Sequence, residues 1–355
     1  MKLTLGWLKD HLETDATLEQ VLEKLTAVGL EVESVTDRAA ELADYTVAHV
    51  VEAVPHPDAD RLRVCKVDTG SGIEQVVCGA PNARTGMKGV FARSGLTIPG
   101  TGLTLKPTKI RGVESNGMLV SEREMGLSNE HDGIIELAAD APVGVPFAGV
   151  VGLDDPVIEV AITPNRQECL GIHGIARDLA AAGLGTLKPF NRDPVGGAFP
   201  SPIGVRFTFD DPATADACPV FHGCYVRGVK NGPSPEWMQR RLKAIGLRPI
   251  STLVDITNFV TYDLGRPLHV FDADKVQGDI QVRLARVGES FVALDDRTYE
   301  MAGGECVIAD DSGAHGLGGV MGGAANGCTA ETVNVFIESA WFDPGRTAQT
   351  GRRHG

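Results

Sequence analysis

The stretch from residue 40 to about residue 150 constrains the fold most, because it holds short strand-like segments separated by glycine. These segments cover residues 45–51, 62–67, 75–78, 89–92, 117–120 and 133–137. Short strands with glycine-rich connections, packed into about 100 residues, are typical of a small barrel or sandwich. This part of the chain is therefore predicted to be all-β, with both architectures open.

The segments on either side of this β-rich stretch have helical patterns. Thr17 is a candidate N-cap for a helix whose apolar residues follow helical spacing over 18–25 and which Gly29 ends. A strand is expected next, over 30–35. A second helix is predicted to start near residues 163–165 and to end at Gly183. Residues 1–38 are too few to bury a core, so they are expected to pack on a later part of the chain.

After a Pro/Gly-rich linker at 188–202, the remaining residues mix strand and helix patterns. Strands are expected over 205–209, 221–227, 279–285, 291–294 and 306–309, with a helix over 235–245. The run 253–272 places Asn258 and His269 eleven residues apart, around the turn signal Gly265-Arg266-Pro267. It is interpreted as a strand, a loop and a strand that line a pocket with hydrogen-bonding groups.

Charge is unevenly distributed along this acidic chain. Its 355 residues, enough for two or three domains, carry a net charge of -14, yet residues 75–113 contain no Asp or Glu. Cations without acids are a candidate phosphate-facing surface. A chance solvated face is the alternative. The cations of this stretch, which we predict to face the phosphate groups of a nucleic acid, are Arg84, Lys88, Arg93, Lys106, Lys109 and Arg111.

Other features limit the cellular compartment and the chemistry. No apolar stretch reaches the roughly 18 residues that a membrane span needs, and the N-terminus lacks the pattern of a signal peptide. A cytoplasmic location is therefore expected. The seven cysteines form no C-x-x-C pair, so no zinc site or disulfide framework is expected, and no other metal site is indicated.

Three segments carry a resemblance to a known family. Residues 56–70 (HPDADRLRVCKVDTG), 77–84 (VCGAPNAR) and 121–127 (SEREMGL) resemble the tRNA-binding OB-fold. With the patterns before and after them, the chain resembles the N-terminal part of the beta subunit of bacterial phenylalanine–tRNA ligase. The resemblance implies that the six cations of the acid-free stretch bind tRNA. The resemblance implies an α+β multidomain fold. A small α/β domain (1–39 plus 151–200) would hold an inserted OB-fold barrel (40–150), followed by a mixed α/β B3/B4-type editing domain (205–355).

The resemblance also implies an editing activity, the hydrolysis of tyrosine wrongly attached to tRNA-Phe. A synthetic pocket rejects an added hydroxyl group by only about 10²-fold, so a second, hydrolytic site is needed. Glu338 matches the family's tyrosine-reading glutamate; an ordinary strand-end acid is the alternative. His269 matches the histidine near the scissile ester, with Thr257 and Asn258 as the polar pair beside it. A structural histidine is the alternative, and water activation by the substrate's own ribose hydroxyl is equally open.

The run 318–323, G-G-V-M-G-G, matches the glycine loop of the same pocket. Glycine lets a backbone approach a ligand closely, and free N–H groups can bind its carbonyl or carboxylate group. A tight turn between strands is the alternative. The substrate-binding residues implied here are Gly319, Gly322 and Gly323.

For the whole enzyme, the resemblance implies an aminoacyl-tRNA ligase made of two alpha and two beta chains that acts on tRNA-Phe, with no membrane or DNA partner. This chain has no pattern of an ATP site, so ATP and Mg²⁺ are expected to serve the whole enzyme without binding here. Family members continue well beyond residue 355, and an incomplete editing pocket is expected. The alternative is a tRNA-binding module without catalytic activity.

Overall fold

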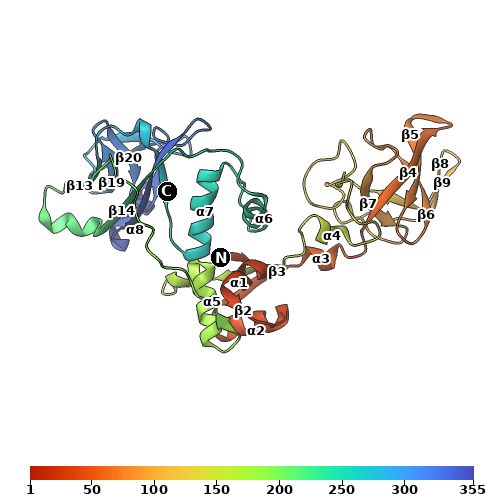
Figure 1. Ribbon diagram of the computed structural model, residues 1–355, viewed down its shortest axis with the longest axis horizontal. Coiled ribbons are helices and arrows are strands. Elements are labelled where there is room, and N and C mark those ends of the chain that lie inside the picture. Colours follow the sequence, from red (N-terminus) through yellow and green to blue (C-terminus); the bar gives the residue numbers. More distant parts are fainter. The chain divides into compact units, whose positions relative to one another are not determined.

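The computed structural model describes all 355 residues and divides them into two compact units (Figure 1). The inserted unit covers Val35–Val157, and the composite unit joins Met1–Ser34 to Ile158–Gly355. The sequence predicts separate domains over 1–39 plus 151–200 and over 205–355; the composite unit contains both segments, and their separation stays a prediction. None of the helices has the length and apolar character needed to span a membrane.

The inserted unit is built on a five-stranded antiparallel sheet that forms a nearly closed barrel. The strand order is β10 (Gly117–Leu119), β7 (Lys88–Arg93), β4 (Thr46–His56), β5 (Ala59–Asp68) and β6 (Ile73–Cys78), and β6 also contacts β10. A hairpin of β8 (Thr108–Ile110) and β9 (Val113–Ser115) and the short helices α3 (Arg38–Glu41) and α4 (Phe147–Val150) complete it. The all-β prediction is confirmed, and the barrel is the architecture found.

One strand predicted for this unit, over 133–137, is wrong. Only an isolated bridge between Leu137 and Lys88 remains of it. Ile135 and Leu137 still donate to the carbonyl groups of Val120 and Lys88, at 2.8 Å and 2.9 Å, but at Ile134 a side chain takes the place of a partner strand. The amide group of Asn82 donates from Nδ2 to the Ile134 carbonyl at 2.8 Å and accepts from the Ile134 N–H at 3.0 Å.

The composite unit begins with a small α/β layer. Its three-stranded sheet has the order β1 (Lys2–Thr4), β11 (Val157–Ala161) and β3 (Glu31–Thr36), and β2 (Leu12–Glu13) pairs with β12 (Thr186–Leu187). The helices are α1 (Leu5–His11), α2 (Leu18–Ala27) and α5 (Ile172–Ala181). Thr17 caps α2 through a capping box with Gln20, and Gly29 follows the helix at φ +83°, as predicted.

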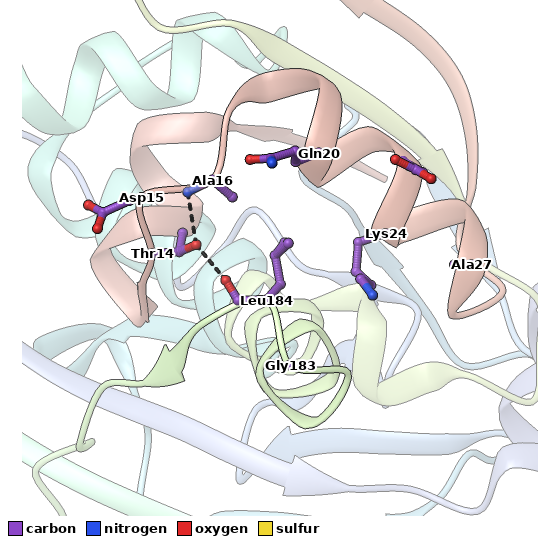
Figure 2. A pocket seen from close by; sticks show the side chains of 9 residues that line it. Thr14, Asp15, Ala16, Gln20, Lys24, Ala27, Gly183 and Leu184 are labelled. Carbon is purple, nitrogen blue, oxygen red and sulfur yellow. Dashed lines mark hydrogen bonds between the residues drawn. The ribbon is translucent and has the colours of Figure 1, made fainter.

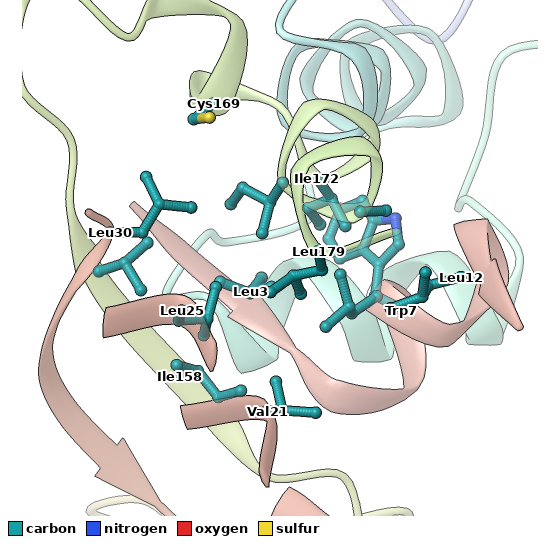
Figure 3. Close-up of a cluster of buried hydrophobic side chains, with 14 of the residues drawn as sticks. Leu3, Trp7, Leu12, Val21, Leu25, Leu30, Ile158, Cys169, Ile172 and Leu179 are labelled. Carbon is teal, nitrogen blue, oxygen red and sulfur yellow. The ribbon is translucent and has the colours of Figure 1, made fainter. Parts of the chain in front are cut away.

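The core of this layer joins segments from both ends of the sequence. Leu3, Trp7 and Leu25 pack with Ile158 and Leu179, and all five are fully buried (Figure 3). The prediction that the first segment packs on a later one is confirmed. The predicted start of the second helix is wrong, because residues 163–166 form a turn and a 3-10 turn over Gln167–Leu170 precedes α5.

The rest of the composite unit stacks two sheets. One has the order β13 (Val205–Phe207), β16 (Ile280–Leu284), β19 (Cys306–Asp310), β20 (Gly313–Leu317) and β21 (Met321–Gly322). The other has the order β14 (Val220–Arg227), β22 (Asn334–Trp341) and β15 (His269–Asp272). A buried apolar cluster with members on both sheets includes Val282, Ile308, Phe271 and Phe336. A hairpin of β17 (Ser290–Val292) and β18 (Thr298–Glu300) lies beside them.

The strand–loop–strand interpretation of 253–272 is wrong in its first half. Residues Thr252–Leu264 form helix α7, Gly265 ends it at φ +64°, and only His269–Asp272 is a strand. Tertiary contacts explain the helix. The Phe259 ring stacks on Trp7 with 4.8 Å between centroids, and Asp263, one turn later, accepts a hydrogen bond from Trp7 Nε1 at 2.8 Å. Besides α7 and the predicted α6 (Glu236–Ala244), the structure adds a terminal helix, α8 (Pro344–His354).

Candidate functional site in the two-sheet region

The sheet β14–β22–β15 brings His269 and Glu338 together. They are direct register partners on the antiparallel strands β15 and β22. Such partners have Cβ atoms about 4.5–5.5 Å apart on the same face of a sheet. Phe271 and Phe336, two residues along each strand, lie on that face and belong to the buried apolar cluster. The imidazole and carboxyl groups therefore lie side by side on the inward face of this sheet.

Burial changes the protonation of both groups. Glu338 is only 8 % exposed, and this burial raises the pKa of its carboxyl group to about 7. Burial lowers the pKa of His269 to about 4, and its ring lies 4.4 Å from the Phe271 ring, centroid to centroid. His269 Nε2 is buried without a hydrogen-bond partner. At neutral pH the site thus holds an uncharged imidazole and a carboxyl group near its titration midpoint.

Gly322 is the residue of the glycine loop that touches this pair. A Cβ atom built on Gly322 would lie 2.4 Å from His269 Cε1 and 3.2 Å from Leu294 Cδ1. Gly319 has φ +72°, and a Cβ atom on Gly323 would lie 2.2 Å from the His315 carbonyl oxygen. The structure therefore places only Gly322 against the imidazole. The other two glycines meet the backbone demands of a tight turn and of close strand packing.

Thr257 and Asn258 lie on α7, not on a strand beside His269. The Thr257 hydroxyl donates to the Val254 carbonyl at 2.8 Å, and His269 Nε2 has no hydrogen-bond partner. Helix α7 does contact β15. Neighbouring helix positions point about 100° apart, so these two side chains do not share one direction. Their participation in the site stays a prediction.

Arg266 supports the site and was missed as a functional residue. Its Nε donates to Ser339 Oγ at 3.1 Å, and its Nη2 donates to the Ala340 carbonyl. The turn after α7 is thereby tied to β22 immediately after Glu338. The sequence showed Arg266 only as the middle of a Gly-Arg-Pro turn, and no signal in the pattern indicated its partners.

The Glu338 carboxyl group is expected to make stability depend on pH. Its pKa is raised from 4.5 to about 7 in the folded chain, so between these values the folded state binds more protons than the unfolded state. The contribution of Glu338 to the free energy of unfolding should therefore fall as pH rises through this window, by up to about 1.4 kcal/mol per pH unit. The lowered pKa of His269 contributes a change of the opposite sign below pH 6.5, so the difference between the wild-type chain and Glu338→Gln isolates the glutamate. Glu338→Gln should reduce this loss. Denaturant unfolding of both proteins at pH 5 and pH 8 measures the change in the free energy of unfolding. An identical change in the two proteins would contradict the contribution of Glu338.

The cations of the acid-free stretch do not form one unpaired face. Arg93 pairs with Asp44 at 2.8 Å, Lys109 pairs with Glu114 at 3.6 Å, and Arg84 pairs with Glu136. Acids from outside the stretch thus neutralise half of the predicted set. The remaining three differ: Lys88 Nζ donates to the Ala141 carbonyl, Arg111 donates to the Asp58 carbonyl, and Lys106 is exposed with no partner.

Two further features carry less chemistry. A surface pocket of about 540 Å³ lies between α2 and residues 183–184 (Figure 2). Thr14 there donates to the Leu184 carbonyl at 2.5 Å, and Gln20 is engaged in the capping box. Glu168, Cys169 and Asp178 have ligand-type atoms within 4.8 Å of one another, but the guanidinium group of Arg166 contacts all three. An arginine thus fills the place that a cation would take.

Comparisons with known proteins agree with this architecture. Residues 45–146 match the family model of a putative tRNA binding domain, and residues 217–355 match that of a B3/4 domain. The class is therefore a tRNA-binding domain joined to a B3/4 domain. The chain is 58% identical over 353 residues to the phenylalanine–tRNA ligase beta subunit of Paramagnetospirillum magneticum and 60% identical over 356 residues to that of Brucella suis. The chain belongs to the family of phenylalanine–tRNA ligase beta subunits.

These matches cover 99% and 100% of this chain, but 44% of each relative, so the chain spans less than half the length of the curated relatives. Among solved structures, an N-terminal fragment of the phenylalanyl-tRNA synthetase beta subunit from Pyrococcus horikoshii is similar at 14% identity and a TM-score of 0.32. The matched region covers 57% of this chain and 62% of the Pyrococcus horikoshii chain. That likeness carries no argument about the site.

Proposed function

We propose that this chain binds tRNA-Phe through the inserted unit and hydrolyses tyrosine from it at the His269–Glu338 site. The observation that supports the proposal most is the direct cross-strand pairing of these two buried polar residues. No ion pair stabilises either of them, and His269 Nε2 is unpaired. Buried polar groups without partners are rare in folded chains, and a polar ligand would relieve the cost.

Glu338 would distinguish tyrosine from phenylalanine by accepting a hydrogen bond from the tyrosine hydroxyl group. A tyrosine hydroxyl can donate to the carboxyl group, which has no hydrogen bond of its own. A phenylalanine side chain would leave that group buried and unpaired, at a cost of about 1–3 kcal/mol. Phe271 and Phe336, buried beside this pair, make the surroundings of the carboxyl group apolar, so the site offers no other polar contact to distinguish the two amino acids. Discrimination would therefore rest on the hydroxyl group alone.

His269 would position the reaction rather than act as a strong base. With a pKa of about 4, the imidazole is uncharged at neutral pH and can accept a hydrogen bond from water or from the terminal ribose. Water adds to the ester carbonyl, the bond to the ribose oxygen breaks, and tyrosine leaves while the ribose hydroxyl regains a proton. The substrate's own ribose hydroxyl stays an alternative means of activating the water.

For the whole enzyme, we propose the partners that the beta subunit family implies. These are tRNA-Phe and an alpha subunit, in a complex of two alpha and two beta chains located in the cytoplasm. Amino acid activation with ATP and Mg²⁺ would take place outside this chain.

A tRNA-binding module without chemistry is the second candidate. The low exposure of Glu338 favours it, because only 8 % of that residue is open to an incoming side chain. The test is the hydrolysis of Tyr-tRNA-Phe and of Phe-tRNA-Phe by the purified chain. Selective release of tyrosine supports editing. Binding of tRNA without release of either amino acid supports the module.

Charge reversal at Lys106 is expected to weaken tRNA binding. Lys106 is exposed and unpaired near the β8–β9 hairpin, so Lys106→Glu should lower affinity and reduce the slope of log K against log salt by about one. Lys66→Glu is a matched control, since Lys66 is exposed but paired with Glu52 at 2.6 Å. Titrations at several salt concentrations measure both. Equal effects of the two changes would contradict a phosphate contact at Lys106.

A further inference from the structure

The inserted unit contains a second surface pocket, of about 400 Å³, where the end of β6, β10 and the turn over 121–124 meet. Its volume is sufficient for one planar heterocycle. Its lining combines an apolar surface with a few polar groups, the arrangement typical of ligand sites. The apolar part is formed mainly by Val77, Ala80, Pro81, Met118, Leu119 and Ile134.

Glu124 places a fixed acceptor in this pocket. One carboxylate oxygen, Oε2, accepts from the Ser121 backbone N–H at 2.7 Å and from Ser121 Oγ at 2.9 Å. The Glu124 carbonyl accepts from the Gly100 N–H at 2.8 Å, which holds the turn in place. Local structure thus accounts for Oε2 alone. The second oxygen, Oε1, has no partner and is available to a ligand that donates a hydrogen bond.

The rim adds an unpaired cation. Arg123 lines the pocket, is exposed, and forms no hydrogen bond or ion pair through its guanidinium group. His131 lies on the same rim, where its Nδ1 is 3.2 Å from the Asn129 carbonyl. A cation beside a pocket that contains a carboxylate suits a ligand with a phosphate group next to a hydrogen-bond donor. A nucleotide has both.

We propose that this pocket receives one unstacked RNA base bearing an exocyclic amino group, which donates to Glu124 Oε1 while Arg123 contacts an adjoining phosphate. This inference rests on the proposed tRNA binding by the inserted unit and assigns it a base-reading position. Cytosine, adenine and guanine carry such an amino group. Uracil presents a carbonyl oxygen where cytosine has its amino group, and that oxygen would repel the carboxylate. The pocket should therefore discriminate against uracil.

The test compares single-stranded RNA hexamers of cytidine and of uridine, which differ at this position but match in size and charge. Wild-type chain is expected to bind the cytidine hexamer about tenfold more tightly, as for one hydrogen bond to a charged group. Glu124→Gln should abolish or invert this preference. Its amide oxygen is held by the Ser121 N–H, so the amide NH₂ takes the place of Oε1 and disfavours a donor.

Glu130→Gln is the matched control, because Glu130 is exposed, has no side-chain partner and does not line the pocket, yet loses the same charge. It should keep the preference for cytidine. Equal affinity of the wild-type chain for both hexamers, or an unchanged preference in Glu124→Gln, overturns the base-reading pocket. If tRNA still binds in those cases, only the pocket is rejected. If neither tRNA nor any hexamer binds, the proposed tRNA binding is rejected with it.

Discussion

Glu338→Ala is expected to lower the preference for Tyr-tRNA-Phe over Phe-tRNA-Phe by roughly 10- to 100-fold. The substitution removes the carboxyl group that would accept the tyrosine hydroxyl, and a hydrogen bond to such a group is worth about 1.5–3 kcal/mol. Phenylalanine ester hydrolysis should fall little or rise, because the unpaired acid no longer penalises it. The ratio of kcat/KM values for the two esters measures the effect.

Glu300→Ala provides the matched control for Glu338→Ala. Glu300 is an exposed acid on β18 and has no side-chain partner, so its loss should leave the preference unchanged. A Glu338→Ala protein that folds and keeps the full preference for the tyrosyl ester would remove Glu338 from the site. A parallel loss for both esters would also count against it, because the proposal predicts a change in selectivity.

Gly322→Ala is expected to reduce hydrolysis of Tyr-tRNA-Phe by about 100-fold with little change in tRNA affinity. The new Cβ atom would lie 2.4 Å from His269 Cε1, so the imidazole must move. Misplacing a catalytic group by about 1 Å can cost 10²-fold in rate. As a positioning residue, Gly322 should affect kcat more than KM, which single-turnover hydrolysis and tRNA titrations separate.

Gly351→Ala is the control for that change. Gly351 lies in α8, and a Cβ atom built there meets nothing within 4 Å, so the same substitution is made without a collision. It should leave hydrolysis intact. Normal hydrolysis by Gly322→Ala would show that the imidazole position is not needed, and would favour water activation by the ribose hydroxyl.

Local patterns in the sequence predict the barrel and the capped helix well. Glycine-separated strand segments predict β4, β5, β6 and β7. Thr17, the predicted N-cap of α2, forms a capping box with Gln20, three residues later. These features depend on residues close in the chain. Helix α7 is different, because its β-branched residues Val254, Ile256 and Val260 favour a strand. Contacts of Phe259 and Asp263 with Trp7, far away in the sequence, override that preference.

The candidate site could not be assembled from periodicity. His269 and Glu338 meet only through the register of β15 on β22, and their pairing was expected solely from the family resemblance. The same limit applies to the acid-free stretch. Three of its six cations are paired by Asp44, Glu114 and Glu136, which lie outside residues 75–113, and Asp44 and Glu136 approach their partners only in the folded barrel. Sequence counts therefore overestimate its free positive charge.

The most direct test of the His269–Glu338 site is the affinity of the chain for non-hydrolysable amide analogues of tyrosyl- and phenylalanyl-adenosine. Calorimetric titration of the wild-type chain and of Glu338→Ala measures both. We expect the wild-type chain to bind the tyrosyl analogue at least about tenfold more tightly than the phenylalanyl analogue, as for one hydrogen bond to a carboxyl group. Glu338→Ala should bind the two analogues equally. Equal affinities in the wild-type chain, or a preference that survives in Glu338→Ala, would contradict the assignment of this site.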